Sequence, residues 1–408
     1  MIYTAILGHG TVGSGVAEIL INHNALVCEK IKDELSVKYI LELRDFSHLP
    51  YADKFTSDFN RIVNDDEVKI VAEVMGGIHP AYEFVKECLQ RGKSVVTSNK
   101  ELVAQKGAEL FSIAAKKNVN FLFEASVGGG IPILRPMAQC LAANDINSVT
   151  GILNGTTNYI LDKMIVDSMD FDTALSLAQE KGFAEKDPTA DIEGHDTCRK
   201  ICILASLAFG KHVYPKQVKT EGISGITLDD VAYAEKFNCE IKLIAKAKKL
   251  PGGKITAEVA PMLVSHSNML SHVDGVFNAI MVNGDATGDV MFYGKGAGKM
   301  PTASAVAADI IDCAKHLHAR KYFDWQEGEK DYVVPDDGKK RFYVLIKSLD
   351  YEALANSFDA VFPENTWNVK NEFAGEIAFI TDEDYEDETN KKLSKLKYES
   401  IKILKTLF

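Results

Sequence analysis

A glycine-rich turn close to the first residue limits the fold of this chain more than any other stretch. Residues 3–20 read YTAILGHGTVGSGVAEIL, which predicts an apolar strand, a turn and an amphipathic helix. Gly8 would allow the tight bend, Gly10 would let the backbone approach a pyrophosphate, and Gly13 would pack the helix on the strand. Free N–H groups at the helix start, at Thr11 and Val12, would face phosphate oxygens. The pattern predicts dinucleotide binding, with a purely structural glycine turn as the alternative.

The region after this turn alternates between expected strands and helices. Strands are expected at residues 37–43, 68–74, 94–98 and 119–126, and helices at residues 81–92 and 101–117. Such alternation predicts an α/β fold with a doubly wound, parallel, Rossmann-type sheet. Ligands of these sheets bind at the carboxyl ends of the strands. One crevice there would be lined by Gly76, Gly77, Ser98, Lys100 and Glu124.

The expected pattern changes beyond residue 134 and suggests two further domains. Residues 135–294 predict an α+β domain for substrate binding and dimerisation, and a helix at about 295–320 is expected to return to the cofactor domain of residues 1–134. After a polar linker, residues 335–408 read strand, helix, two strands, helix and strand, the order of a small separate domain. A chain shortened before residue 335 is therefore expected to fold and to stay active.

Composition restricts the partners and the compartment. With 408 residues the chain should form two or three domains, and its net charge of -12 argues against a nucleic-acid partner. The first residues lead directly into a strand, and no apolar run reaches membrane-spanning length, so we expect a cytoplasmic protein without a membrane partner. The seven cysteines contain no C-x-x-C pair and are expected to be reduced, mostly buried thiols.

An acidic stretch leads into a helix that carries charges on its apolar face. Residues 182–200 read GFAEKDPTADIEGHDTCRK and contain five carboxylates. Asp196 and Lys200 are four residues apart, so they share one helix face, which continues through Ile203 and Leu204. Unpaired burial of charge is costly, so these groups need partners or a polar ligand. We expect a lined pocket, and a buried structural ion pair is the alternative.

Six motifs together resemble the homoserine dehydrogenase family. They cover roughly residues 1–320 and read GHGTVGSGV, VVTSNKELVA, EASVGGGIPI, GILNGTTNYIL, GFAEKDPTADIEGHDTCRKICILA and GKGAGKMPTASAV. The resemblance implies an NAD(P)-dependent oxidoreductase that interconverts L-homoserine and L-aspartate 4-semialdehyde, for the biosynthesis of threonine, methionine and isoleucine. We expect no aspartate-kinase domain before residue 1, so the expected likeness is to the monofunctional form.

The resemblance also implies roles for individual residues. It assigns substrate binding to Glu185, Asp191 and Asp196, and function to two lysines, Lys100 and Lys200. An ammonium that is close and desolvated can protonate the oxygen that forms when hydride reaches an aldehyde. Lys200, held by Asp196, is the expected proton donor, and Lys100 is the second candidate. Gly182 and Gly298 match family positions near the cofactor.

A sodium ion is a further implication of the resemblance. In the family the segment matching EASVGGGI binds sodium, which carries over to the Glu124 carboxylate and to the backbone carbonyls of Val127, Gly129 and Ile131. One carboxylate with carbonyl oxygens suits a hard cation. The alternative is a structural loop in which Glu124 accepts hydrogen bonds from backbone amides.

The choice between NAD and NADP depends on the end of the second expected strand. A carboxylate there binds ribose hydroxyls of NAD, whereas an arginine accommodates the 2′-phosphate of NADP. The sequence ELRDFS offers both, and by strand alternation Glu42 and Arg44 share one side. We predict that NADP is accepted, and that Arg44→Ala weakens NADP binding more than NAD binding.

The last 70 or so residues resemble an ACT domain in element order. The family usually has an Asp-x-x-Gly turn after the first strand, whereas residues 348–358 read SLDYEALANSF without the glycine. Threonine feedback and a dimerising or vestigial role both stay open, and a homodimer or homotetramer is expected. A catalytically silent regulator of a partner kinase is the alternative function, and the presence of both Lys100 and Lys200 argues against it. A glyceraldehyde-phosphate-type enzyme would need a nucleophilic cysteine, which EASVGGG lacks.

Overall fold

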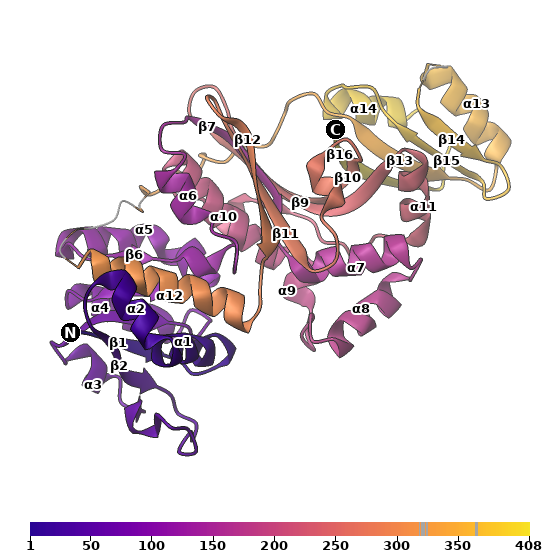
Figure 1. The fold of residues 1–408 in the computed structure, drawn as a ribbon. Coiled ribbons are helices and arrows are strands. Elements are labelled where there is room, and N and C mark those ends of the chain that lie inside the picture. Colours follow the sequence, from indigo (N-terminus) through magenta and orange to yellow (C-terminus); the bar gives the residue numbers. More distant parts are fainter. Residues whose placement is uncertain (318, 320–322, 324, 364–365) are drawn as a thin grey trace.

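Two β-sheets organise the chain, and helices cover them (Figure 1). The computed structural model describes residues 1–317, 319, 323, 325–363 and 366–408. The first sheet has six strands in the order β3-β2-β1-β4-β5-β6. The second is a mixed sheet that begins at β12 and ends in the C-terminal part of the chain. The part of the predicted helix region that falls on residues 318 and 320 lies outside the described residues.

The first sheet is parallel at every pairing, which confirms the expected Rossmann-type fold. Its strands are β1 (Ile2–Leu7), β2 (Leu35–Leu41), β3 (Phe55–Thr56), β4 (Val68–Glu73), β5 (Ser94–Thr97) and β6 (Phe121–Leu122). The strand expected at 119–126 is wrong in length, because the chain forms a 3₁₀ turn at Glu124–Ser126 after β6. That turn follows from a tertiary contact, since the N–H of Glu124 donates to Asp309 at 2.8 Å.

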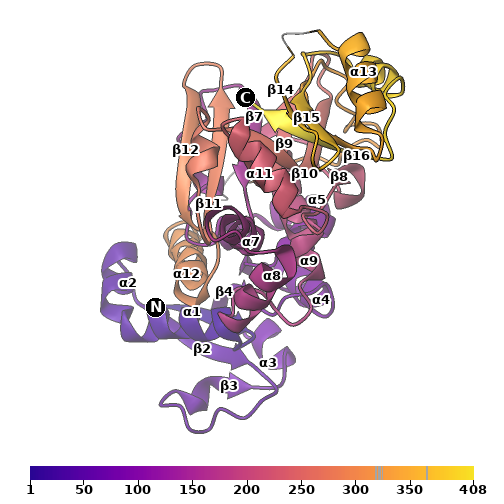
Figure 2. The same ribbon diagram turned by 90° about the vertical axis from the view of Figure 1, so that its right-hand side faces the viewer.

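Helices connect these strands and cover the sheet. They are α1 (Thr11–Asn22), α2 (Asn24–Ile31), α3 (Asn60–Val63), α4 (Ala81–Gln90) and α5 (Lys100–Lys117). The long helix α12 (Lys299–Lys315) packs against α1, as the sequence predicts for a returning helix (Figures 1 and 2). Their approach is close, because a Cβ placed on Gly15 would lie 2.8 Å from the Ala303 Cβ.

The second sheet forms the middle of the chain. Its strands here are β7 (Ile146–Ile152), β8 (Lys219–Thr220), β9 (Cys239–Lys249), β10 (Ile255–Ser265), β11 (Phe277–Gly284) and β12 (Gly288–Lys295). The accompanying helices are α6 (Leu134–Gln139), α7 (Gly155–Val166), α8 (Phe171–Glu180), α9 (Thr189–Ile192), α10 (His195–Phe209) and α11 (Leu228–Lys236). Strands β9 and β10 pair over their whole length in the antiparallel sense, and α10 packs on them.

The C-terminal part has the predicted element order but is joined to the second sheet. It consists of β13 (Phe342–Lys347), α13 (Tyr351–Val361), β14 (Asn368–Asn371), β15 (Glu376–Ile380), α14 (Glu386–Leu393) and β16 (Ser400–Leu407). Strand β16 pairs in parallel with β10, from Met262 opposite Lys405 to Val264 opposite Leu407 (Figure 2). The sheet therefore runs without interruption from β12 to β14. This pairing modifies the expectation of a separate unit, because β16 covers the part of the β10 edge at Met262–Val264, beside the part that β8 covers.

Side chains strengthen the junction between α11 and the C-terminal part. Tyr233 donates from its hydroxyl to Glu376 at 2.6 Å. Lys402 forms an ion pair with the fully buried Asp230 and also donates to the carbonyl of Gly225 at 2.7 Å. The C-terminal part is thus fixed by backbone pairing and by buried polar contacts.

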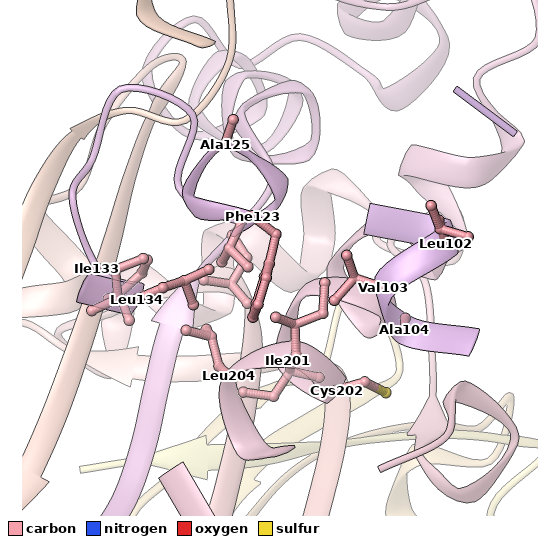
Figure 3. Close-up of a cluster of buried hydrophobic side chains, with 14 of the residues drawn as sticks. Leu102, Val103, Ala104, Phe123, Ala125, Ile133, Leu134, Ile201, Cys202 and Leu204 are labelled. Carbon is pink, nitrogen blue, oxygen red and sulfur yellow. The ribbon is translucent and has the colours of Figure 1, made fainter. Parts of the chain in front are cut away.

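A continuous hydrophobic core links the region of the first sheet with the middle of the chain (Figure 3). It brings together buried side chains of α5, of the segment after β6, of α6 and of α10, namely Leu102, Val103, Ala104, Phe123, Ala125, Ile133, Leu134, Ile201, Cys202 and Leu204. This packing fixes α5 and α10 relative to each other. Within the described ranges, no helix is long and apolar enough to cross a membrane.

Candidate active site

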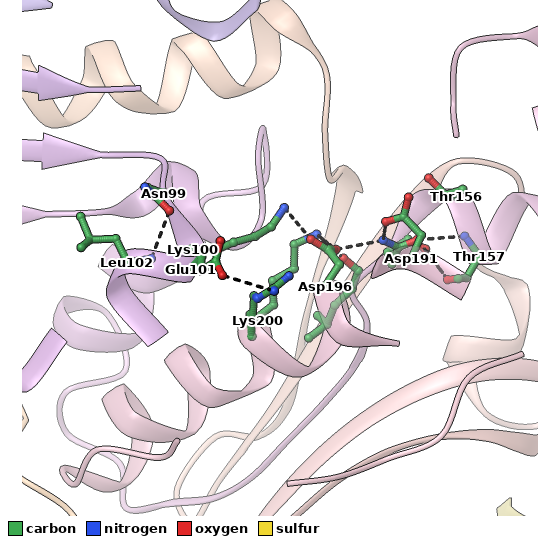
Figure 4. A network of polar contacts seen from close by, with 12 residues as sticks. Asn99, Lys100, Glu101, Leu102, Thr156, Thr157, Asp191, Asp196 and Lys200 are labelled. Carbon is green, nitrogen blue, oxygen red and sulfur yellow. Dashed lines mark hydrogen bonds and ion pairs between the residues drawn. The ribbon is translucent and has the colours of Figure 1, made fainter. Parts of the chain in front are cut away.

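The N-terminal ends of α5 and α10 meet and bring charged residues of both regions together (Figure 4). Lys100 is the first residue of α5, three residues beyond the carboxyl end of β5. Asn99 fixes this turn, because its side chain accepts from the N–H of Leu102 at 3.1 Å and donates to the carbonyl of Gly77 at 2.6 Å. The sequence therefore places Lys100 at the strand edge where doubly wound sheets bind their ligands.

Asp196 lies between two lysines. One carboxylate oxygen is 2.5 Å from Nζ of Lys100 and the other is 2.7 Å from Nζ of Lys200. Lys200 also donates to the carbonyl of Leu153 at 2.7 Å. The Asp196 and Lys200 side chains are only 6% and 8% exposed, whereas that of Lys100 is 39% exposed. The pair faces inward, as the helix spacing predicts, and forms a buried ion pair, whereas the lined pocket stays a prediction. The contact with Lys100 was not foreseen.

Asn154 connects this cluster to a second carboxylate. Its side-chain nitrogen donates to Asp191 at 2.6 Å and to Asp196 at 2.9 Å. Sequence reasoning missed this role, although the residue lies within the motif GILNGTTNYIL. The available signal was its position as the N-cap of α7, where asparagine is favoured.

Burial and mutual charge shift the pKa values of the cluster in different directions. Burial would raise the pKa of Asp196, but the ammonium groups of Lys200 and Lys100 hold it well below its usual range. Burial lowers the pKa of Lys200 although Asp196 opposes this. Burial also acts against the charged form of Lys100, but Asp196 prevails and raises the pKa. Burial and the charge of Asp196 raise the pKa of Asp191.

Glu185 and Gly182 lie on the loop between α8 and α9, outside this cluster. The Glu185 side chain is exposed, and within the described part of the chain its carboxylate makes neither a hydrogen bond nor an ion pair. The loop is tied to α7 because the Thr156 hydroxyl donates to the carbonyl of Phe183 at 2.6 Å. Gly182 has a φ of +72°, which favours glycine. The structure therefore joins Asp191, but not Glu185, to the two lysines.

The glycine-rich turn forms one wall of a cavity of about 370 Å³. A Cβ on Gly13 would lie 2.0 Å from the carbonyl oxygen of Gly8, so only glycine permits this approach of helix to strand. Gly8 and Gly10 line the cavity, and Thr11 and Val12 start α1 beside it. The other predicted cofactor contacts lie after β4, after β5 and at the start of α12, at Gly76, Gly77, Ser98 and Gly298.

Glu42 and Arg44 face each other at the end of β2 and line the same cavity. The Glu42 carboxylate accepts from the N–H groups of His9, at 3.0 Å, and of its own turn. The Arg44 guanidinium lies 2.8 Å from it, and this hydrogen bond lowers the pKa of Glu42 to about 2. The prediction that both side chains share one side is thus confirmed, and the arginine is engaged by the carboxylate.

The Glu124 carboxylate has a structural role, whether or not it also binds a metal ion. Its carboxylate accepts from the N–H groups of Ile133, Leu134 and Arg135, at 2.7, 2.8 and 2.8 Å, which starts α6. This is the backbone-bonded arrangement that the sequence left open. Within the described residues the carbonyl oxygens of Val127, Gly129 and Ile131 accept no hydrogen bond, and no cluster of three His, Cys, Asp or Glu side chains could hold a metal.

Two family models match most of this chain. Residues 8–124 match the family model described as the NAD binding domain of homoserine dehydrogenase, and residues 132–311 match that described as homoserine dehydrogenase. The homoserine dehydrogenase of Synechocystis sp. is 43% identical over 314 residues, which cover 75% of this chain and 72% of the relative. The chain belongs to the homoserine dehydrogenase family.

Solved structures of homoserine dehydrogenases extend the likeness to the whole chain. The enzyme from Thiobacillus denitrificans has a TM-score of 0.90 at 33% identity and covers 100% of this chain and 98% of its own. A mutant of a hyperthermophilic archaeal homoserine dehydrogenase, solved in complex with NADPH, has a TM-score of 0.65 at 28% identity, covering 76% and 97%. As a homoserine dehydrogenase, the chain is an NAD(P)-dependent oxidoreductase that interconverts L-homoserine and L-aspartate 4-semialdehyde.

Proposed function

We propose that Lys200 is the proton donor when this chain reduces L-aspartate 4-semialdehyde to L-homoserine. When bound, the nicotinamide cofactor supplies the hydride. The observation that carries the proposal is the environment of the Lys200 Nζ atom, which is buried and donates to the Leu153 carbonyl and to Asp196. An ammonium has three N–H donors. Two are directed by these acceptors, so the third is available for the substrate oxygen, which gains the proton as Lys200 becomes a neutral amine.

The lysine pKa shifts favour Lys200 over Lys100 for this role. A proton donor works best when its pKa lies close to the operating pH, and burial moves the pKa of Lys200 downward, toward that range. The pKa of Lys100 is raised through its contact with Asp196, which makes its proton harder to release. We assign Lys100 to charge compensation beside the nicotinamide and Asp196 to orientation of both ammonium groups.

For substrate recognition we propose that Asp191 binds the ammonium of the amino acid. Asp191 is joined to Asp196 through the Asn154 amide and interacts electrostatically with both lysines. Its second oxygen is available, because the Asn154 amide engages only the first. Asp196 would contribute negative potential to the same pocket. Glu185 is proposed as a further ligand from the loop over this site, supported by the family motif rather than by a contact.

We further propose that the chain accepts both NAD and NADP. The glycine turn and the positions after β4 and β5 would bind the cofactor, through Gly8, Gly10, Thr11, Val12, Gly13, Gly76, Gly77, Ser98 and Lys100, with Gly182 and Gly298 nearby. Glu42 would bind ribose hydroxyls and Arg44 a 2′-phosphate, which is supported by their position in the lining of one cavity. The NADPH bound by the archaeal relative supports the second cofactor.

A sodium ion is proposed at the loop after β6. The residues of this loop fit such an ion, because the carbonyl oxygens of Val127, Gly129 and Ile131 accept no hydrogen bond from the described residues. The Glu124 carboxylate receives three N–H groups and keeps one lone pair for a cation. Oxygen-only ligation suits a hard monovalent ion. Its role would be to fix the loop that ends the first sheet.

A homodimer or homotetramer is proposed through the outer face of β11 and β12. Tyr293 on β12 is 52% exposed and stacks on Phe277 with ring centroids 5.1 Å apart.

The three-domain division and an ACT-like role of residues 335–408 also remain proposals, supported by the βαββαβ order.

The decisive test is the oxidation of NADH or NADPH by L-aspartate 4-semialdehyde with Lys200→Ala. We expect the turnover number to fall by about 100- to 10,000-fold, because a general acid is removed. Cofactor affinity, measured by nicotinamide fluorescence, should be retained. Near-normal turnover would refute Lys200 as the donor and transfer the role to Lys100.

A further inference from the structure

The side-chain amide of Asn154 is held between two carboxylates that would otherwise repel each other. Asn154 is 5% exposed and is the last residue before α7. A primary amide nitrogen carries two hydrogens. The acceptors are Asp191 at 2.6 Å and Asp196 at 2.9 Å, so each carboxylate can receive one hydrogen.

The other end of the amide fixes its orientation. The Asn154 side-chain oxygen accepts from the N–H of Thr157 at 2.9 Å and from the Thr157 hydroxyl at 3.2 Å. A reversed amide would place its oxygen against two carboxylates and its nitrogen against an N–H group, which are repulsive contacts. The start of α7 therefore determines which way the amide points and where the two carboxylates lie.

We infer that Asn154 is a positioning residue that sets the spacing of Asp191 and Asp196 for substrate binding and proton transfer. The inference rests on the roles proposed above for these two carboxylates. The Asn154 amide acts on the reacting atoms only through the carboxylates that it orients. A neutral donor suits this position, because it donates to both carboxylates without adding charge to a cluster that already holds Lys100 and Lys200.

The competing explanation is that Asn154 serves only as the N-cap of α7. Serine is an N-cap residue of similar strength, so Asn154→Ser keeps an acceptor for the helix start and removes both amide donors. A matched control is Asp350→Ser at the N-cap of α13, where the aspartate accepts from the N–H of Ala353 at 3.0 Å. Asp350 lies on the C-terminal part, outside the cluster of lysines and carboxylates.

We expect Asn154→Ser to raise the KM for L-homoserine by about 10- to 100-fold, since hydrogen bonds to charged groups contribute on this scale. The turnover number should fall less, and cofactor affinity should stay unchanged. Melting temperature should drop more than in Asp350→Ser, because two carboxylates lose a buried donor, and Asp350→Ser should keep normal kinetics. If Asn154→Ser loses only melting temperature and keeps its kinetic constants, the positioning role is refuted.

The pH profile adds a readout that a helix cap alone would not move. Asp191 faces Asn154, Asp196, Lys100 and Lys200, and the Asn154 hydrogen bond favours its ionised form. Loss of that bond should raise the pKa of Asp191, so the acidic limb of kcat/KM should move to higher pH. Asn154→Asp should move it further, because a third carboxylate is added. An acidic limb at the wild-type position in both variants would overturn the inference.

Asp191→Asn separates this inference from the function on which it rests. If Asp191→Asn leaves the KM for L-homoserine unchanged, the proposed ammonium site is wrong, whatever Asn154 does. If Asp191→Asn raises this KM and Asn154→Ser does not, the site stands and the positioning role fails.

Discussion

Replacing Asp196 with asparagine tests how the electrostatics of the site control the reaction. The substitution keeps the shape of the side chain and removes the one charge shared by two ammonium groups. Lys100 can turn toward water, since its side chain is 39% exposed, whereas Lys200 is 8% exposed and stays buried. Breaking a buried pair costs about 3–5 kcal/mol. Lys200 can instead release its proton and become neutral. We therefore expect the free energy of unfolding to decrease by an amount near the lower of these two values.

The kinetic consequence has a defined sign. Asp196 raises the pKa of Lys200, while burial and Lys100 lower it. Without Asp196 the pKa of Lys200 must fall further, and its protonated fraction is lost at a lower pH. The alkaline limb of the semialdehyde reduction rate should therefore move to lower pH in Asp196→Asn. Beyond the new pKa the rate should decrease about tenfold for each pH unit, as simple titration of one proton donor requires.

The assay is the turnover number for NADPH or NADH oxidation from neutral to alkaline pH, with unfolding in urea measured on the same protein. Lys200→Ala serves as the control, because it should show no alkaline limb from this lysine. An alkaline limb that stays in place in Asp196→Asn would refute the claim that Asp196 controls the protonation of Lys200.

Two further predictions concern the cofactor and the C-terminal part. Arg44→Ala should weaken NADP more than NAD, because the guanidinium lines the cavity proposed for the cofactor and would contact a 2′-phosphate there; equilibrium titration of both cofactors checks this, and an equal loss would contradict it. Removing residues 335–408 was expected from the sequence to leave an active enzyme, but the β16–β10 pairing changes this expectation. Deletion uncovers the edge of β10 and leaves Asp230 buried without Lys402, so we expect a lower melting temperature and self-association. A monodisperse, fully active truncated chain in light scattering and kinetics would contradict this reasoning.

Local patterns predicted the parts of the fold that depend on neighbours in the chain. The glycine turn, the parallel alternation and the inward face of Asp196 and Lys200 follow from spacings of a few residues. Contacts over long separations did not follow, such as Lys100 with Asp196, and Asn154 with two acidic residues. The 119–126 region was expected to be one strand, because its apolar run gives no sign that Asp309 accepts from the N–H of Glu124. The C-terminal part was predicted to be independent for the same reason. The order of its strands along the sequence does not show that β16 pairs with β10.

The ion pairs between α5 and α10 also determine how these two helices align. Lys100 and Glu101 are adjacent and opposite in charge. Lys100 pairs with Asp196 at 2.5 Å, and Glu101 pairs with Arg199 at 3.5 Å, so the two partners on α10 are also opposite in charge. A shift of α10 that exchanged the partners would set lysine against arginine and glutamate against aspartate. Like charges in such proximity are unfavourable, so the misaligned packing is disfavoured while the native one is favoured. Lys100 therefore contributes, together with Glu101, Asp196 and Arg199, to a set of ion pairs that favours one alignment of α5 with α10.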